Sequence, residues 1–286
     1  MILLRAGGVA LLLDCTAGQL PAVVHWGADL GELSASDAAT MIAAGVHPIV
    51  PNIVDEPVRV AMLPEHRTGW VGRPGLSGSR GGRDWSPRFT GAEVFVDGDA
   101  VTEAGLTSLG AGVVVWKGAD AVAGLGLTLT VELTPDGLVR TRARLVNDGS
   151  DDYQLGDLVM ALPVPPVARE LFDFGGRWGR ERSPQRGPFT VGVHLREGRK
   201  GRTGPDAATV LHAGVPGFDF GSGEMWGVHT GWSGNHTHYA ERLSTGEQVL
   251  GGGELLLPGE VALAPGASCE SPWLYGSYGN GLDEVA

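Results

Sequence analysis

Residues 125–146 read LGLTLTVELTPDGLVRTRARLV and decide the fold class. Apolar and polar residues alternate along residues 125–133 and again along residues 138–146, the period of a β-strand with one buried face. The second run puts three arginines on one face, namely Arg140, Arg142 and Arg144. Between the runs, Thr-Pro-Asp-Gly is a turn signal. The stretch therefore predicts an antiparallel hairpin with one solvated face.

Strand patterns recur along the rest of the chain. They occur at residues 9–14, 22–26, 92–96, 112–116, 155–164, 190–195, 225–232, 237–242, 254–257 and 260–264. Evidence for helix is limited to residues 34–44, SASDAATMIAA, with Ser34 or Ser36 as the N-cap and Gly45 at the end. The chain has 47 glycines and 18 prolines, spread as turn punctuation. We expect an all-β protein, a sandwich of stacked antiparallel sheets with a few short helical turns.

Composition excludes several classes of protein. A chain of 286 residues that is 42% hydrophobic and 19% charged is globular, with room for a sizeable core. Its net charge of −12 disfavours nucleic acid as a partner. No apolar run approaches the roughly 18 residues of a membrane helix. Residues 1–15, MILLRAGGVALLLDC, resemble a lipoprotein signal, but Gly7-Gly8 interrupts the apolar run and Asp14 stands where a small residue is needed, so we predict a strand.

The two cysteines, Cys15 and Cys269, are too few for a disulfide framework. We expect two buried thiols in a reducing compartment, and hence a cytoplasmic protein. Whether the two cysteines meet depends on whether the first and last strands pair, which the sequence leaves open.

Residues 66–89, HRTGWVGRPGLSGSRGGRDWSPRF, lack periodicity and hold six glycines, five arginines and two tryptophans. A long irregular loop in a compact domain is usually functional or disordered, and its aromatic residues favour function. Tryptophan faces stack on sugar rings, and arginine forks donate to hydroxyls or carboxylates. The residues that we select as substrate-contacting candidates are Trp70, Arg73, Arg80 and Trp85.

A second cluster lies in residues 172–184, FDFGGRWGRERSP. Its members are Arg177, Trp178, Arg180, Glu181 and Arg182. One interpretation is a saccharide-contacting surface; the one that we favour is structural, with Arg–Glu pairs and Arg–Trp stacks that anchor an irregular segment. A buried network of this kind predicts that Glu181→Ala costs on the order of 3 kcal/mol.

Other catalytic patterns are weak. Residues 231–235, GWSGN, lack the helix that follows a hydrolase nucleophile, and no glycine-rich stretch ends in Gly-Lys-Ser/Thr. His236 and His238, with His229 nearby, suggest metal ligands, but hydrogen-bonded histidines at a sheet edge explain them more simply. The acidic residues available for catalysis have no spacing that fixes a glycosidase geometry, and they are Asp173, Glu181, Glu224, Glu241 and Glu260. We expect no catalytic residue, no metal and no cofactor.

Four motifs in order add a resemblance. They are FDFGGRWGRERSP at residues 172–184, GEMWGVHTGWSGNHTH at residues 223–238, LPGE at residues 257–260, and YGSY at residues 275–278 followed by Gly281-Leu282. Together they resemble the amino-terminal domain of glycoside hydrolase family 36 α-galactosidases, most strongly over residues 120–286. Trp232 departs from the tyrosine that is common in the family, and residues 67–89 replace a shorter loop whose arginine corresponds to Arg73 or Arg80.

The resemblance implies a single large two-layer antiparallel β-supersandwich over residues 1–286. In the family, a (β/α)₈ barrel follows and holds both catalytic aspartates of retaining hydrolysis. We therefore expect a bacterial, non-catalytic domain whose partners are the barrel of the same polypeptide, its α-galactoside substrate and further copies in a homo-oligomer, with no nucleic acid or membrane. The resemblance places the Arg177–Arg182 cluster near the interdomain surface and extends the Trp70–Trp85 loop toward a neighbouring active site. A stand-alone carbohydrate-binding or oligomerisation module is the alternative.

Overall fold

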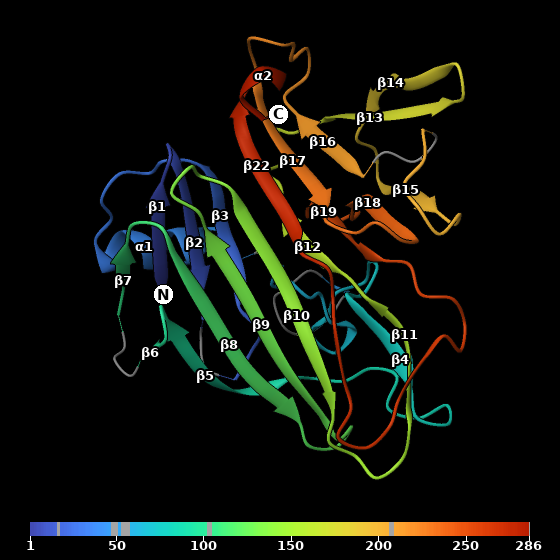
Figure 1. The fold of residues 1–286 in the computed structure, drawn as a ribbon. Helices are drawn as coiled ribbons and strands as arrows, with labels where there is room; N and C mark the ends of the chain where they lie inside the picture. Colours follow the sequence, from blue (N-terminus) through green and yellow to red (C-terminus); the bar gives the residue numbers. More distant parts are fainter. Residues whose placement is uncertain (16–17, 47–50, 53–57, 102–104, 206–208, 286) are drawn as a thin grey trace.

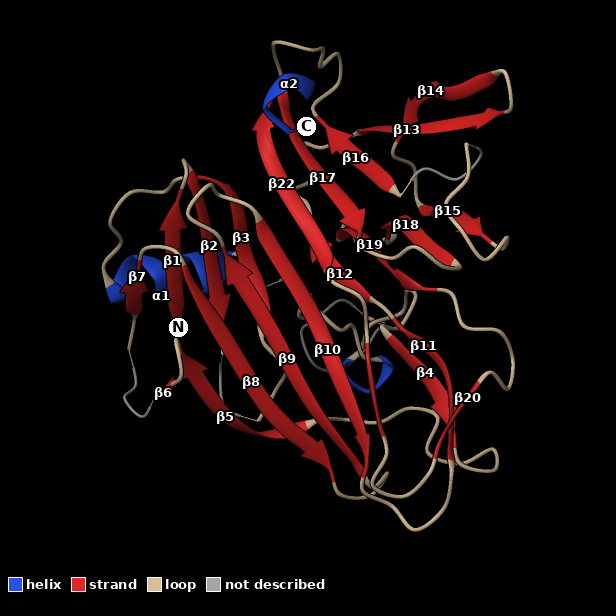
Figure 2. Cartoon of the chain, in the orientation of Figure 1, coloured by secondary structure: helices blue, strands red, loops and turns tan. Residues whose placement is uncertain are grey.

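The structure is a computed structural model that describes residues 1–15, 18–46, 51–52, 58–101, 105–205 and 209–285. These residues form antiparallel sheets in two layers, with a few short helices (Figures 1 and 2). The expected all-β sandwich is therefore confirmed. No helix among the described residues has the length and apolar character needed to cross a bilayer.

One layer is a single eleven-stranded sheet. Its strand order is β14 (Arg180–Pro188), β13 (Glu170–Arg177), β16 (Val210–Gly214), β17 (Glu224–Thr230), β22 (Leu274–Asn280), β10 (Val139–Asn147), β9 (Leu125–Leu133), β8 (Gly112–Asp120), β5 (Thr90–Val96) and β6 (Asp99–Ala100), with β21 (Ser268–Glu270) also paired to β10. The hairpin predicted from residues 125–146 is its centre. The register pairs Val139 with Leu133, and Gly137 has the positive φ of 86° that its turn requires.

The other layer consists of three smaller sheets. Their strand orders are β3 (Ala22–Ala28), β2 (Val9–Asp14), β1 (Ile2–Ala6), β7 (Thr107–Leu109); β20 (Val261–Leu263), β11 (Tyr153–Leu158), β4 (Leu76–Ser79); and β12 (Met160–Pro163), β19 (Gln248–Glu254), β18 (His236–Arg242), β15 (Gly192–Gly198). Strands β1 and β7 pair in parallel, and every other pair among the described residues is antiparallel.

One large hydrophobic cluster joins the two layers. Leu129 and Val131 of β9 and Leu11 and Leu13 of β2 belong to the same buried cluster. The indole of Trp226 in the large sheet donates to the carbonyl of Trp26 in β3 at 3.0 Å. The alternation of residues 125–146 is thus the consequence of one face of the large sheet lying on the smaller sheets.

Helix α1 (Ala35–Ala44) begins and ends where the sequence predicts. Ser34 is the N-cap and accepts from the amide of Asp37, whose carboxylate accepts from the amide of Ser34 at 3.0 Å. This reciprocal pair is a capping box, and Gly45 is the C-cap. Helix α1 lies outside the sandwich, beside the β1–β3 sheet (Figure 1).

Three strand predictions and one prediction of an irregular segment need correction. The amino-terminal strand is a β1–β2 hairpin, because Gly7 and Gly8 both have positive φ. The predicted strand over residues 155–164 is split between β11 and β12, which belong to different sheets. Residues 255–257 lie outside β19. The irregular segment expected at residues 172–184 is instead most of the β13–β14 hairpin, because its glycines permit a bulge and a turn.

Residues 66–89 are packed and do not form a free loop. They contain a 3₁₀ turn (His66–Thr68) and β4, and Phe89 is buried with its amide donating to Glu65 at 2.8 Å. Glycine in this segment allows a neighbouring side chain to pack directly against the backbone. A Cβ on Gly78 would lie 2.5 Å from the ring of Tyr153.

Candidate functional site

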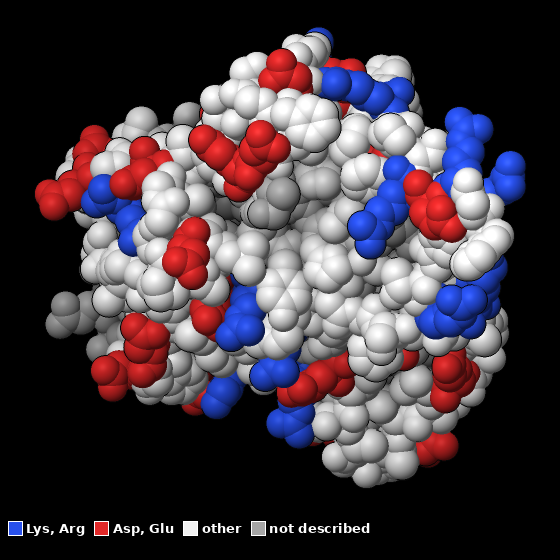
Figure 3. All heavy atoms as spheres, turned by 45° about the horizontal axis from the view of Figure 1, so that its top comes forward, with Lys and Arg blue, Asp and Glu red and all other residues white. Residues whose placement is uncertain are grey.

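A groove of about 1650 Å³ crosses the face of the large sheet that is turned away from the smaller sheets. Figure 3 shows the hollow, with charged side chains on its rim and uncharged ones within. Strands β13, β14, β16, β17 and β22 contribute to it, together with the turn around Gly137, Gly7 and Val9 of the β1–β2 hairpin, and the last helix, α2 (Leu282–Val285). The groove is a large concave surface lined by aromatic and polar side chains, and we take it as the candidate site.

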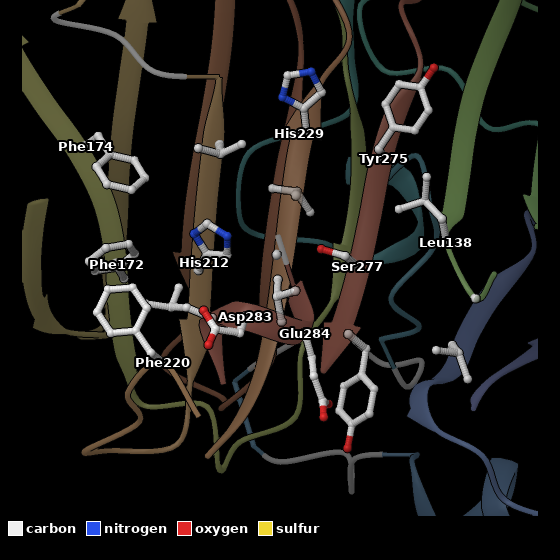
Figure 4. Close-up of a pocket in the computed structure, with 18 of the residues that line it drawn as sticks. Leu138, Phe172, Phe174, His212, Phe220, His229, Tyr275, Ser277, Asp283 and Glu284 are labelled. Carbon is white, nitrogen blue, oxygen red and sulfur yellow. The ribbon is translucent and has the colours of Figure 1, made fainter. Parts of the chain in front are cut away.

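Strand register places the lining side chains in rows. Val210 pairs with His229, and His229 pairs with Tyr275. In the next row, Phe172 pairs with His212, His212 with Gly227, and Gly227 with Ser277. Residues that are directly opposite across neighbouring strands point to the same face. Figure 4 accordingly shows Phe172, His212, His229, Tyr275 and Ser277 along one surface.

Helix α2 closes one end of the groove. Val285 packs with Phe218 and Met225 in a small buried cluster on the groove side of the sheet. Glycine makes this seat possible, because a Cβ on Gly227 would lie 2.9 Å from Val285 Cγ1. A Cβ on Gly279 would lie 2.6 Å from Glu284 Cβ. The sheet thus carries two glycines where the helix approaches most closely.

Both histidines of the groove are neutral at neutral pH. Burial lowers the pKa of His212 to about 4, and the Phe172 ring lies 5.8 Å from its ring centroid to centroid. Burial also lowers the pKa of His229, whose Nδ1 lies 3.1 Å from the Thr209 hydroxyl. The floor of the groove is therefore aromatic and uncharged.

The charges lie on the rim. Acidic side chains of the rim are Asp136, Asp219, Asp283 and Glu284, and basic ones are Arg182 and Arg186. Arg186 donates to Glu170 at 2.6 Å and lies 3.8 Å from the Phe218 ring centroid, so it is already held in place. An uncharged floor with a charged rim is the anatomy of a protein–protein contact.

The acidic residues that the sequence offered as catalytic candidates have structural partners. Glu224 accepts from the Tyr278 hydroxyl at 2.6 Å, and Glu241 accepts from the Arg73 amide at 2.7 Å. Glu181 and Glu260 accept from the amides of Gly179 and Leu257 within their own turns, both at 2.7 Å. Asp173 accepts from His194 at 2.9 Å. Each carboxylate has a structural partner, as expected for acids at turns and strand ends.

The four substrate-contacting candidates do not form one surface. Trp70 is 1% exposed and donates to the Arg73 carbonyl at 2.9 Å, so it belongs to a buried cluster. Arg73 pairs with Asp157 at 3.1 Å and lies over the Tyr239 ring. Arg80 is 7% exposed. Trp85 alone of the four is largely exposed, at 64%, and it lies outside the groove. Their contact with a substrate stays a prediction, which burial makes difficult for Trp70 and Arg80.

The Arg177–Arg182 cluster is exposed, so the buried network expected from the sequence is wrong. Its five side chains are all exposed, and Trp178 reaches 89%. The hairpin that carries them is edge strand β14 with its partner β13, and an edge strand has no neighbour to bury it. Arg182 lines the groove, which the sequence did not reveal.

Of the histidines considered as metal ligands, two are buried in β18, whereas His229 is exposed in β17. His236 and His238 stack with parallel rings 6.1 Å apart, and burial lowers the pKa of His238 to about 3. Within the described ranges, no group of three potential ligand side chains is placed to hold a metal. Neither of the sulfhydryls, Cys15 and Cys269, is in a disulfide, and burial raises the pKa of Cys15 to about 11.

Sequence reasoning missed most of the groove. Phe172, His212, His229 and Tyr275 lie on four different strands, whose order in the sheet the sequence does not state. The motif at residues 223–238 contained a signal for the groove. Met225, Gly227 and His229 alternate along a predicted strand, so the face opposite the core carries residues other than the usual charged ones.

Comparison with known families identifies the family of this chain. The family model described as "Glycosyl hydrolase family 36 N-terminal domain" matches residues 19–264. Among curated proteins, an α-galactosidase from Escherichia coli is 33% identical over 253 residues, which are 88% of this chain and 33% of that protein. The α-galactosidase AgaA from Geobacillus stearothermophilus is 30% identical over 172 residues, which are 58% of this chain and 24% of that protein. The chain thus spans a third or less of the curated relatives.

Solved structures show the same fold. AgaA from Geobacillus stearothermophilus superposes with a TM-score of 0.80 and 20% identity, covering 99% of this chain and 41% of that one. The α-galactosidase from Lactobacillus brevis superposes with a TM-score of 0.72 and 17% identity, covering 97% of this chain and 39% of that one. In both, the superposition covers about two fifths of the enzyme.

Proposed function

The chain belongs to glycosyl hydrolase family 36 as its N-terminal domain, and from this we propose that it is the non-catalytic support of a retaining α-galactosidase. In this proposal, the groove on the large sheet seats the catalytic (β/α)₈ barrel of the same polypeptide. The parent enzyme removes terminal α-D-galactosyl residues.

The groove is the observation that carries the proposal. Its volume of about 1650 Å³, its uncharged aromatic floor and its charged rim suit a protein surface better than a single sugar. Helix α2 lies at one end of it, so a segment following Val285 in a longer polypeptide would start at the groove. The relatives support the proposal because two thirds of the Escherichia coli enzyme lies outside the region that matches this chain.

Further parts of the proposal concern the setting of the parent enzyme. We expect a bacterial, cytoplasmic homo-oligomer that needs no cofactor. We also propose that the Trp70–Trp85 loop extends toward a neighbouring active site. In this proposal Trp85 makes the contact, because Trp70 is buried.

A fusion tests the support function. This chain replaces the 253-residue matched segment of the Escherichia coli α-galactosidase, and hydrolysis of p-nitrophenyl α-galactoside is measured for the fusion and for the chain alone. We expect the fusion to be active and the chain alone to be silent. Tyr275→Asp places a charge on the aromatic floor of the groove. In calorimetry of the fusion, the sandwich and the catalytic domain should then unfold in separate transitions and not as a coupled unit. Hydrolysis by the chain alone would refute the proposal.

Carbohydrate binding is the second candidate, favoured by the aromatic rings, Ser277 and the carboxylates that line the groove. Titrating raffinose into the chain, followed by NMR or calorimetry, separates the two. If raffinose binds with millimolar or tighter affinity and Tyr275→Ala removes this binding, the groove is a sugar-binding site and not the seat of the barrel.

A further inference from the structure

The tip of the β13–β14 hairpin, residues 177–182, is ordered but uncovered. Trp178 is 89% exposed, and Arg177, Arg180 and Arg182 are exposed around it. The hairpin projects from the body of the sandwich at the end of the large sheet (Figure 1). Building on the function proposed above, we propose that this tip is a basic arm that binds acidic side chains on the catalytic domain seated in the groove.

The base of the arm is fixed to the sandwich. Arg196 of β15 donates to the Phe174 carbonyl at 2.7 Å and pairs with the buried carboxylate of Asp173 at 3.1 Å. Burial opposes ionisation of Asp173, but the hydrogen bond from His194 and the charge of Arg196 outweigh it and lower its pKa. The arm is therefore held by an ionised carboxylate between two strands of opposite layers.

The backbone of the arm also fixes its direction. Gly176 has φ of 157°, and a Cβ there would lie 2.3 Å from the Pro205 carbonyl oxygen. Arg182 has a positive φ of 47°, which is uncommon for a residue with a side chain. A rigid arm loses little conformational entropy when a partner binds it.

The charge of the arm differs from that of the rest of the chain. Residues 177–182 hold three basic residues and one acidic one, in a chain with 21 basic and 33 acidic residues. The carboxylate of Glu181 is occupied by the Gly179 amide. Across the described part of the chain, no carboxylate forms an ion pair with Arg177, Arg180 or Arg182. The three exposed guanidinium groups are therefore available to pair with an acidic surface.

The arm is continuous with the groove. Phe174, Arg182 and Pro184 of the same hairpin line the groove, so an occupant as large as a domain also meets the tip. An acidic patch on the occupant would pair with the guanidinium forks while an apolar or aromatic group covers Trp178. The arm would then fix the orientation of the catalytic domain relative to the sandwich. The aromatic floor of the groove, which offers no charged contacts, would not fix this orientation by itself.

Hydroxyl-radical footprinting tests the arm. The rate of Trp178 oxidation is measured by mass spectrometry in the chain alone and in the Escherichia coli fusion, in 50 mM NaCl. We expect at least fivefold protection of Trp178 in the fusion. Replacing Arg177, Arg180 and Arg182 with glutamate should reduce this protection to less than twofold. The matched control replaces Arg83, Arg88 and Arg144, which are exposed outside the groove, and should leave the protection unchanged.

The possible outcomes separate the two proposals. If Tyr275 is protected in the fusion but Trp178 is not, the groove is occupied and the arm is refuted. If neither is protected, the support function itself fails. If Trp178 becomes protected in the chain alone as the protein concentration rises, the tip contacts a second copy of the chain. If the chain alone binds polygalacturonate, the tip binds an anionic polysaccharide. Either result would overturn the proposal that the tip binds the catalytic domain. Footprinting a mixture of the chain with the separately expressed remainder of the Escherichia coli enzyme replaces the fusion if the fusion does not fold.

Discussion

Arg80 and Arg180 carry the same guanidinium group, yet their surroundings give them opposite roles. Arg80 is 7% exposed and donates to the Asn147 side chain at 2.6 Å and to the Ala123 carbonyl at 2.5 Å, with Asp84 at 3.0 Å. Arg180 is exposed on a hairpin. In the sequence both are arginines among glycines, so residue type and spacing did not distinguish an anchor from a surface group.

Replacing Arg80 with alanine should destabilise the protein strongly. The substitution leaves Asn147, Ala123 and Asp84 without their shared donor in a buried site, which costs about 3 kcal/mol. Urea unfolding of the variant and of the unmodified chain measures the difference. A loss below 1 kcal/mol would contradict the role as an anchor.

Glu181→Ala should leave the free energy of unfolding unchanged within experimental error. This reverses the expectation from the sequence, because the side chain is exposed and its carboxylate serves one amide of its own turn. The same urea titration checks it, with Arg80→Ala as the positive control. A large loss would mean that the hairpin tip packs more tightly than the structure shows.

Glu65→Gln should stabilise the protein more at pH 8 than at pH 5. Burial raises the pKa of Glu65 to about 7 from the ordinary 4.5, so between these values the unfolded chain ionises while the folded protein stays protonated. Stability is therefore lost as pH rises through this window, by about 3 kcal/mol. Glutamine keeps the acceptor for the Phe89 amide and stays neutral.

The measurement for Glu65 is the difference in unfolding free energy between variant and unmodified chain at the two pH values. That difference removes contributions of the other titrating groups. Glu181→Gln is the matched control on an exposed carboxylate, and it should show the same small effect at both pH values. An equal effect of Glu65→Gln at pH 5 and pH 8 would show that the carboxyl is hydrated in the folded protein.

Elements on the large sheet are positioned by glycine as much as by hydrophobic residues. Helix α2 has four residues, too short to be stable without packing. It is held because Gly227 and Gly279 leave space and because Leu282 and Asp283 donate to the carbonyls of Asp219 and Phe220, both at 3.0 Å. At this scale the sequence predicted strand β17 correctly, but it did not predict the helix on top of it.

Gly227→Ala should loosen α2. The new methyl group would lie 2.7 Å from the His212 ring and 2.9 Å from Val285, so the helix or the ring must move, at a cost of about 1–3 kcal/mol. Hydrogen exchange of residues 282–285 should accelerate. Gly187→Ala is the control, because nothing lies within 4 Å of a Cβ there. Unchanged exchange in Gly227→Ala would show that α2 is not seated on this strand.

At the scale of the whole molecule, one core is shared by the two layers. Leucines of β2 and β9 belong to it, although more than 100 residues separate them in the chain. A chain of this length often unfolds in several steps. A continuous core instead favours one cooperative unit.

We therefore expect a single unfolding transition. Far-UV circular dichroism, which follows the sheets, and tryptophan fluorescence, which reports the surroundings of all eight tryptophans including Trp26 and Trp226 between the layers, should have coincident midpoints. Dithiothreitol should not shift them, because both cysteines are free. Two separated midpoints would divide the chain into independently folding parts.

The sequence by itself determined the features that depend on near neighbours. The alternation of residues 125–146 fixed a hairpin and its two faces, because the strand period is a local property. The ends of α1 were predicted from Ser34 or Ser36 as the N-cap and from Gly45, because caps are bonds between residues three or four apart, and the structure selects Ser34. Four ordered motifs fixed the family.

Only the tertiary structure decided which residues are buried and which surround the groove. Strand β13 lies beside β16 and β22 beside β10, pairings that join segments far apart in the chain. Trp70 is buried because it packs with residues far along the chain, such as Ala161 and Tyr239, whereas Trp178 is exposed because it lies on the edge hairpin. Burial is a sum over contacts that the chain makes with itself at long range, and no local pattern of residues records that sum.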